Sequence, residues 1–278
     1  EALARFNHAR MFGFSASHDL RADGLDARVQ AIFGPVRFRM TYPEAVEHGL
    51  VVPIEVRWTD YKPDGDPCQG ILAGDTTEQA RHGIWRHHAR NAAIAADVRK
   101  HPDDQVLIPV SSIEHGLHLK RLLPEYELVY RQDGIDERDM AAYRSEGIVP
   151  DDFRPMTAER RATLTAAYED GRLKKAITTQ VWRVGVNFKQ LAVLARADAG
   201  GSKINDRQIP GRTSRIFEGK GSAIIYDYPD RWHRGAGNRA FGRHGSYEFM
   251  GWIQRYGPLG PPQRVAGFDG LDDEEDYA

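Results

Sequence analysis

From about residue 85 onward, short apolar runs alternate with helical stretches, and this alternation constrains the fold more than any other feature of the sequence. The connections between the runs are short, which is typical of an α/β domain built on a mostly parallel sheet. The expected strands are 105–110, 127–130, 175–179, 191–195 and 222–228. The expected helices are 85–100, 115–123, 157–170 with Thr157 as its N-cap, 206–216 and 247–256.

The sequence before residue 85 is less regular. A short apolar run at 11–15 and a β-branched segment at 51–58 predict two strands, with a helix at 42–49 between them. Residues 61–75 are rich in proline, glycine and aspartate and show no periodicity. That segment is therefore expected to be a linker or a long loop.

Composition excludes several classes of protein. The 38 Lys and Arg residues nearly balance 40 Asp and Glu residues, which excludes a uniformly basic nucleic-acid coat but not a local basic cleft. Cys68 is the only cysteine, so one chain can form neither a disulfide framework nor a Cys-based zinc site, and we expect no metal. No apolar run reaches the roughly 18 residues that a membrane helix needs, and no signal peptide is recognisable. We expect a cytoplasmic protein without a membrane partner.

Small hydroxyl or glycine residues follow four of the expected strands, at the end of the sheet where α/β proteins bind ligands. These groups are Ser15-Ala16-Ser17, Ser111-Ser112, Thr178-Thr179 and the loop 198–203. They predict one functional rim, although ordinary loop composition explains them equally well.

The strongest local signal is Gln208-Ile-Pro-Gly-Arg212-Thr-Ser-Arg215. On a helix the two arginines share a face, and Gln208 lies one turn before Arg212. Two guanidiniums and an amide pointing the same way form a fork for phosphate oxygens. The alternative is a solvated face whose arginines pair with acids such as Asp206 or Glu218.

This motif and its neighbours resemble superfamily-two helicases in sequence and in order. Gln-x-x-Gly-Arg-x-x-Arg resembles motif VI, and Ser15-Ala16-Ser17 resembles motif III. Residues 106–112 with His115-Gly116 resemble motif IV, and residues 177–188 resemble motif V. The stretches 21–24, 33–36 and 44–53 resemble the branch that holds XPB-like, UvsW-like and restriction-enzyme translocases. The resemblance runs from about residue 10 to about residue 256. Four motifs and the stretches between motifs III and IV, all in the family's order, make it specific.

The resemblance implies a RecA-like P-loop NTPase fold in two parts. We expect the end of a first RecA-like domain at 1–58, a linker at 59–82, a second, helicase C-terminal domain at 83–257 and a disordered acidic tail at 258–278. The implied function is that of an ATP-dependent helicase or translocase. The branch favours DNA over RNA as the partner, and its UvsW-like character points to a phage origin.

The resemblance also implies a role for each matching residue. Arg212 and Arg215 would be arginine fingers on the γ-phosphate of ATP, with Gln208 holding them. Gly185 and Asn187 would lie beside the nucleotide, together with Arg212 and Arg215. Ser15, Ala16 and Ser17 would couple nucleotide state to domain closure. The residues that would contact a nucleic-acid strand are Ser111, Ser112, Thr178, Thr179 and Arg183.

Several departures from the family pattern bear on activity. Asn187 replaces the usual aspartate of motif V, Ser17 replaces threonine, and about 25 residues between Gly134 and Met156 look inserted. The 278 residues contain neither Gly-x-x-x-x-Gly-Lys-Ser/Thr nor Asp-Glu-x-His. The chain begins with Glu1 and enters an apolar segment almost at once. We therefore expect a fragment, inactive alone, whose missing N-terminal part binds most of ATP and Mg²⁺.

Other interpretations stay open. The chain could be a non-catalytic nucleic-acid-binding module on a helicase scaffold. A nuclease or other hydrolase could use Asp227, Asp230 and His233, although loop polarity explains these residues better. Trp182 could stack on a base, but packing between domains is favoured. For His82, His87 and His88, a solvated helix face is favoured over a metal site.

Overall fold

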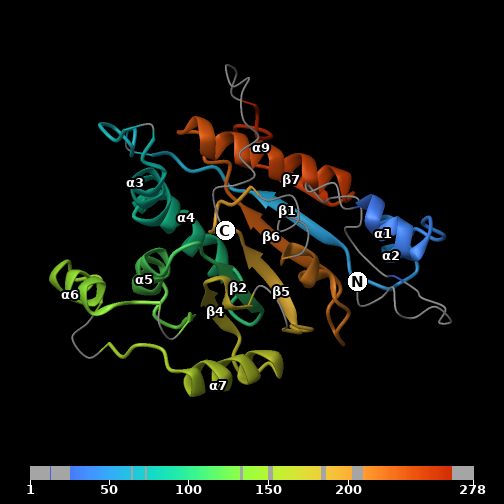
Figure 1. Ribbon diagram of the computed structural model, residues 1–278, viewed down its shortest axis with the longest axis horizontal. Coiled ribbons are helices and arrows are strands. Elements are labelled where there is room, and N and C mark those ends of the chain that lie inside the picture. The colour runs from blue at the N-terminus through green and yellow to red at the C-terminus, as the bar shows by residue number, and fades with distance from the viewer. Residues whose placement is uncertain are drawn as a thin grey trace.

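The computed structural model describes residues 13, 26–63, 65–72, 74–131, 134–149, 153–182, 186–201 and 209–264. Over these residues the chain forms a seven-stranded sheet in the order β3-β4-β2-β5-β6-β1-β7, and all neighbouring strands run parallel (Figure 1). The strands are β1 (Ile54–Trp58), β2 (Gln105–Pro109), β3 (Glu127–Val129), β4 (Lys175–Thr178), β5 (Leu191–Ala195), β6 (Ala223–Asp227) and β7 (Ile253–Tyr256). The expected α/β class with a mostly parallel sheet is confirmed.

Helices cover both faces of the sheet. They are α1 (Asp26–Phe33), α2 (Tyr42–Glu47), α3 (Thr76–Ala80), the π-helix η2 (Arg81–Trp85), α4 (His88–Val98), α5 (Ile113–Leu122), α6 (Glu137–Ser145), α7 (Ala158–Glu169), the 3₁₀ turns η3 (Gln180–Trp182) and η4 (Arg212–Ser214), and α9 (Arg234–Phe249). The Thr157 hydroxyl accepts a hydrogen bond from the Arg160 amide, so the predicted N-cap of α7 is confirmed. None of the helices in the described ranges is both long enough and apolar enough to cross a bilayer.

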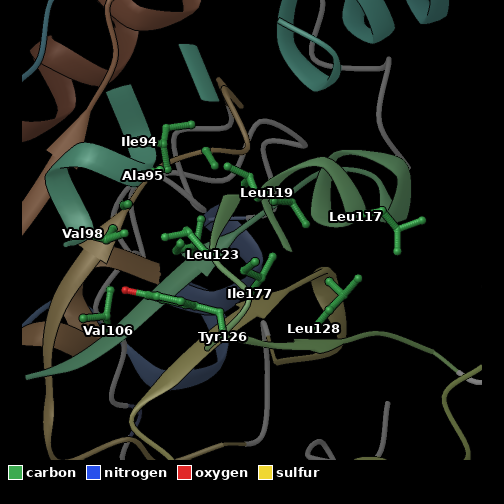
Figure 2. Close-up of a cluster of buried hydrophobic side chains, with 14 of the residues drawn as sticks. Ile94, Ala95, Val98, Val106, Leu117, Leu119, Leu123, Tyr126, Leu128 and Ile177 are labelled. Carbon is green, nitrogen blue, oxygen red and sulfur yellow. The ribbon is translucent and has the colours of Figure 1, made fainter. Parts of the chain in front are cut away.

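Side-chain alternation along the strands divides the core into two layers. Val106 and Ile108 of β2 pack with helices α4, α5 and α6, in the layer that Figure 2 shows. Leu107, between them, points to the opposite face, where α7 and α9 pack. All five residues of β2 are buried. A strand covered on both faces reads as a continuous apolar run, which is why the sequence predicted this strand well.

The first strand, β1, lies in one sheet with the strands of the predicted second domain. Residues 1–58 were expected to belong to a first domain, yet β1 pairs with β6 from Ile54 opposite Ala223 and with β7 from Glu55 opposite Ile253. Ile54, Val56 and Trp58 are buried in the layer that contains α9. Residues 54–58 therefore lie in the sheet predicted for the second domain. The predicted domain bounds, 1–58, 59–82 and 83–257, stay predictions.

The predicted helix at 247–256 is wrong, because two different elements share that segment. Helix α9 ends at Phe249, and Gly251 then adopts a φ of +69°, which reverses the chain at low steric cost. Ile253–Tyr256 forms β7 at the edge of the sheet. Beyond it the Gly257 amide donates to the Trp58 carbonyl at 3.1 Å and the Leu259 amide to Asp60 Oδ2 at 2.9 Å. The start of the predicted disordered tail is thus hydrogen-bonded, and 265–278 lie outside the described residues.

Candidate functional site

The predicted hydroxyl groups after β2 and β4 lie side by side. These two strands are neighbours in register, with Pro109 opposite Thr178, and the Val110 amide donates to the Thr178 carbonyl at 2.8 Å. Ser111-Ser112 and Thr178-Thr179 therefore leave the sheet at the same carboxyl edge. The loop that starts at Asp198 follows β5, the other neighbour of β2, so it leaves at this edge as well.

The four hydroxyls differ in their hydrogen bonds within the protein and in their exposure to solvent. The Ser112 hydroxyl caps α5 by accepting from the Glu114 amide at 3.1 Å. The buried Thr178 hydroxyl donates to the Thr179 carbonyl at 2.9 Å. Ser111 is exposed and Thr179 is half-buried. Exposure therefore favours Ser111 and Thr179 as ligand contacts, and the predicted phosphate contact of Thr178 stays a prediction that its burial does not favour.

Both arginines of the Gly-Arg-x-x-Arg motif contact the segment resembling motif V. Arg212 Nη1 donates to the Trp182 carbonyl at 2.6 Å, and Arg215 Nη1 donates to Asn187 Oδ1 at 2.6 Å. Asn187 is itself held in place, because its backbone amide donates to Glu169 Oε1 at 2.9 Å. Two motifs that are almost thirty residues apart thus form one polar cluster.

The arginines do not lie on one helical face as predicted. Residues 209–211 of the expected helix at 206–216 are helical, but the 3₁₀ turn η4 follows at once and Arg215 has an extended ψ of 137°. Thr213 and Ser214 hydroxyls donate back to the carbonyls of Pro210 and Gly211 at 2.7 Å each. The chain therefore tightens into a 3₁₀ turn after Gly211 and leaves the helix at Arg215. Contacts with the Trp182 carbonyl and with the Asn187 side chain, rather than helical spacing, hold the two guanidiniums.

Lys220 is a third cation of this cluster. Its ammonium donates to the carbonyls of Leu191, Thr213 and Arg215, at 2.7 Å and 3.0 Å for the first and last. Burial, followed by repulsion from Arg215, lowers the pKa of Lys220 to about 8. The same two causes lower the pKa of Arg212. The site therefore holds positive charge at an electrostatic cost, which a bound anion would relieve.

The cation cluster lies at the amino edge of the sheet, opposite the hydroxyl rim. Lys220 contacts the carbonyl of Leu191, the first residue of β5, and the Val52 amide donates to the Ser214 carbonyl just before β1 begins. Parallel strands share the direction of their ends. The two predicted binding regions therefore flank opposite ends of the same sheet.

Some predicted site residues cannot be placed. Those outside the described residues are Ser15, Ala16, Ser17, Arg183, Gly185 and Gln208.

Trp182 packs inside the core. Its ring contacts Tyr168 and Phe188, and its Nε1 donates to Thr165 Oγ1 at 2.8 Å. Only 3% of the residue is exposed. The favoured alternative, that Trp182 is a packing residue, is confirmed, although the packing is against α7 rather than between domains.

The histidine and aspartate groups have structural partners. His87 is buried, caps α4 through the Arg90 amide and contacts Tyr61 and Trp232, so the predicted solvated face is wrong for this histidine. Asp227 is fully buried with Arg243. Asp230 forms a fully buried pair with Arg90, its Oδ1 2.7 Å from Arg90 Nε. No metal-binding group of three such residues occurs within the described ranges.

Two residues that the sequence interpretation missed adjoin the predicted sites. Lys220 sits among the arginines, and its partners are backbone carbonyls, which leave no pattern in the sequence. Trp85 Nε1 donates to Ser111 Oγ at 3.0 Å, at the hydroxyl rim. A tryptophan at the end of a helical segment was indistinguishable from a core residue in the sequence.

The sequence matches no protein-family profile and no curated protein. Among solved structures, it is similar to a fragment assigned as an HsdR subunit of a type I restriction enzyme from Vibrio vulnificus YJ016, with a TM-score of 0.58 and 18% identity. That match covers 91% of this chain and 45% of the other. T4 UvsW matches with a TM-score of 0.46 and 14% identity over 74% of this chain and 41% of its own.

The C-terminal domain of the DEAD-box protein Dbp5 matches with a TM-score of 0.44 and 12% identity, over 74% of this chain and 90% of that domain. The chain thus spans less than half the length of the HsdR fragment and of UvsW. The seven-stranded parallel sheet of the described residues, with helices on both faces, has the fold of RecA-like helicase C-terminal domains.

Proposed function

We propose that this chain is the second RecA-like part of an ATP-dependent helicase or translocase that acts on nucleic acid. The fold and the order of the motifs resembling IV, V and VI both support this function. The stretch between the motifs resembling III and IV favours DNA. The nucleotide would be ATP with Mg²⁺, held mainly by a phosphate-binding loop of a kind that these 278 residues do not contain.

The observation that carries the proposal is the cation cluster of Arg212, Arg215 and Lys220. Arg215 donates to an amide oxygen and Lys220 to three carbonyls, so the acceptors of these two cations are neutral and leave the positive charge in place. The alternative in which Arg215 pairs with Glu218 finds no support, because the described residues form no such ion pair. A triphosphate fits this donor set by charge and by hydrogen-bonding chemistry.

Each residue of the cluster has a distinct role in this proposal. ATP–Mg²⁺ supplies the phosphoryl group, and transfer to water spreads negative charge over its outer oxygens. Arg212 and Arg215 donate hydrogen bonds to that charge. Asn187 and the Trp182 carbonyl orient the two guanidiniums beforehand, which avoids reorganisation during the reaction. Gly185 and Gln208, which the structure does not describe, would lie beside the nucleotide.

The opposite edge of the sheet would contact the nucleic acid. Ser111 and Thr179, with Ser112, Thr178 and Arg183, would hold phosphates of one strand without reading its sequence. The segment Ser15-Ala16-Ser17 would couple nucleotide state to closure of the two domains. Repeated closure would then move the protein along the strand.

The proposal is tested by nucleic-acid-stimulated ATP hydrolysis in the natural polypeptide that contains this chain. Arg212→Ala or Arg215→Ala should each lower turnover by about 10³-fold or more, the usual effect of removing an arginine finger. Arg172→Ala is the matched control and should leave turnover unchanged, because Arg172 is an exposed arginine that pairs with Asp170, two residues away. Full turnover in both finger variants would refute the assigned role.

A second candidate is a nucleic-acid-binding module without ATPase activity. The lack of a Gly-x-x-x-x-Gly-Lys-Ser/Thr sequence in the 278 residues favours it. Single-strand binding by a natural polypeptide that hydrolyses no ATP would select this candidate over the first.

A further inference from the structure

Trp85 lies at the hydroxyl rim although it is remote from the rim in sequence. It is the last residue of the π-helix η2, and its indole Nε1 donates to Ser111 Oγ at 3.0 Å. Ser111 lies two residues after the end of β2, at the carboxyl edge of the sheet. Trp85 is half-buried, so part of the residue meets solvent beside a hydroxyl proposed to hold phosphate.

The surroundings hold Trp85 in one position. Its carbonyl accepts from Asn91 Nδ2 at 2.8 Å, and the Arg81 guanidinium lies over its ring, 5.8 Å from the ring centre. The turn that carries it packs closely on Trp232, because a Cβ at Gly83 would lie 1.9 Å from that ring. Single π-helical turns often occur at functional sites. An aromatic ring fixed in this way loses little conformational entropy when a ligand binds to it.

The charges around Trp85 suit the flat face of a base more than a phosphate. Arg81 and Arg86 both pair with Glu114, whose side chain is almost completely buried. Arg81 also pairs with Glu78, and Arg86 also pairs with Glu146. These carboxylates offset the two guanidinium charges. A neutral aromatic surface of this kind favours stacking, whereas the neighbouring hydroxyl at Ser111 favours phosphate oxygens.

We propose that Trp85 is a stacking platform for one nucleobase of a single strand whose phosphate is held by Ser111. This inference rests on the proposed function, because it needs a nucleic-acid strand at the rim. Stacking on an aromatic ring tolerates any base. Trp85 would therefore fix the strand's position at this edge while leaving its sequence unread.

The test measures binding of the full chain to two labelled single strands, oligo-dT and an abasic strand of the same length, by fluorescence anisotropy. Trp85→Leu keeps an apolar side chain but removes the ring, and should weaken oligo-dT binding by about 5-fold to about 150-fold. It should leave abasic-strand binding unchanged. Trp85→Phe keeps a ring and should retain most of the oligo-dT affinity. Equal losses on both strands would show a merely structural role and overturn the inference.

Intrinsic fluorescence provides a second measurement on the same variants. Trp58, Trp182 and Trp252 are buried, so quenching by oligo-dT should come from the partly exposed indole of Trp85 and vanish in Trp85→Phe. Trp252→Phe is the control, since Trp252 is buried in the core layer that contains α9, and should leave the quenching intact. Quenching that survives Trp85→Phe would refute the platform. If neither strand binds wild-type protein, the proposed function fails first, whichever residue lines the rim.

Discussion

Replacing Asp227 with alanine tests whether the charges at the carboxyl end of β6 are structural. Asp227 and Arg243 are both fully buried. Arg243 Nη2 donates to Asp227 Oδ1 at 2.8 Å and Nε to Oδ2 at 3.0 Å, and the Tyr247 hydroxyl donates to Oδ2 at 2.7 Å. Arg243 retains carbonyl acceptors at Gly200 and Tyr228 after the substitution.

The expected cost follows from what Arg243 loses. Two hydrogen bonds between charged groups are broken, each worth about 1.5–3 kcal/mol. Removing one partner of a buried ion pair costs about 3–5 kcal/mol, which agrees with that sum. Asp230 remains 4.0 Å from Arg243 Nη2 and offsets part of the charge. We therefore expect Asp227→Ala to lower the free energy of unfolding by about 3 kcal/mol, at the lower end of this range.

Urea denaturation followed by circular dichroism measures this change, with a constant m-value as the check on two-state unfolding. The double variant Asp227→Ala/Arg243→Met should lose less than the single variant, because no unpaired charge remains. Arg160→Ala, which removes a half-exposed pair with Glu127, should cost less than about 1 kcal/mol. A loss for Asp227→Ala as small as that of the control would refute the reasoning. It would also restore weight to a catalytic use of Asp227.

Three further predictions concern other parts of the fold. Lys220→Met removes the ammonium that bonds to three carbonyls, and should lower ATP turnover of the natural polypeptide about tenfold or more at pH 7. Wild-type turnover should fall as the pH rises past 8, where that ammonium loses its proton, whereas turnover of the variant should stay low at every pH. Burial, aided by Arg90, holds the pKa of His115 well below 6.5, so just below pH 6.5 only the unfolded state binds this proton. The free energy of unfolding should therefore drop by up to about 1.4 kcal/mol for each pH unit below 6.5. Urea denaturation at pH 5 and pH 7 should show a smaller drop for His115→Gln than for the wild type. Gly83→Ala should destabilise the fold by about 1–3 kcal/mol, because the new methyl group clashes with the Trp232 ring. Gly242→Ala should instead stabilise it by about 0.5–1 kcal/mol, because Gly242 lies in helix α9 and a Cβ there meets nothing within 4 Å. Equal effects of the two variants in thermal unfolding would contradict the packing described.

The sequence predicted the strands at the centre of the sheet well and missed the edge strand β7. β2 and β5 are covered on both faces, so their residues form compact apolar runs that any strand criterion finds. The place of β1 in the sheet depends on pairing with β6, about 170 residues away, which no local pattern encodes. Helix α9 was missed because four glycines interrupt it and because its buried face includes Arg243.

The candidate site was predictable in its residue types and less so in its geometry. Arg212, Arg215 and Asn187 were singled out, and the structure brings them together. Their arrangement comes from a 3₁₀ turn, the Trp182 carbonyl and the Asn187 side chain, which helical spacing does not predict. Backbone acceptors have no sequence signature, so the contacts of Lys220 were not predictable from the sequence.

The most direct test of the central claim is the affinity of the natural polypeptide for a transition-state analogue, ADP with aluminium fluoride and Mg²⁺, compared with its affinity for ADP. If Arg212 and Arg215 act on charge that develops during phosphoryl transfer, alanine at either position should weaken analogue binding by about a hundredfold or more. ADP binding should change by no more than about threefold, because the fingers add little to the ground state. Equal weakening of both ligands, or of neither, would contradict the account.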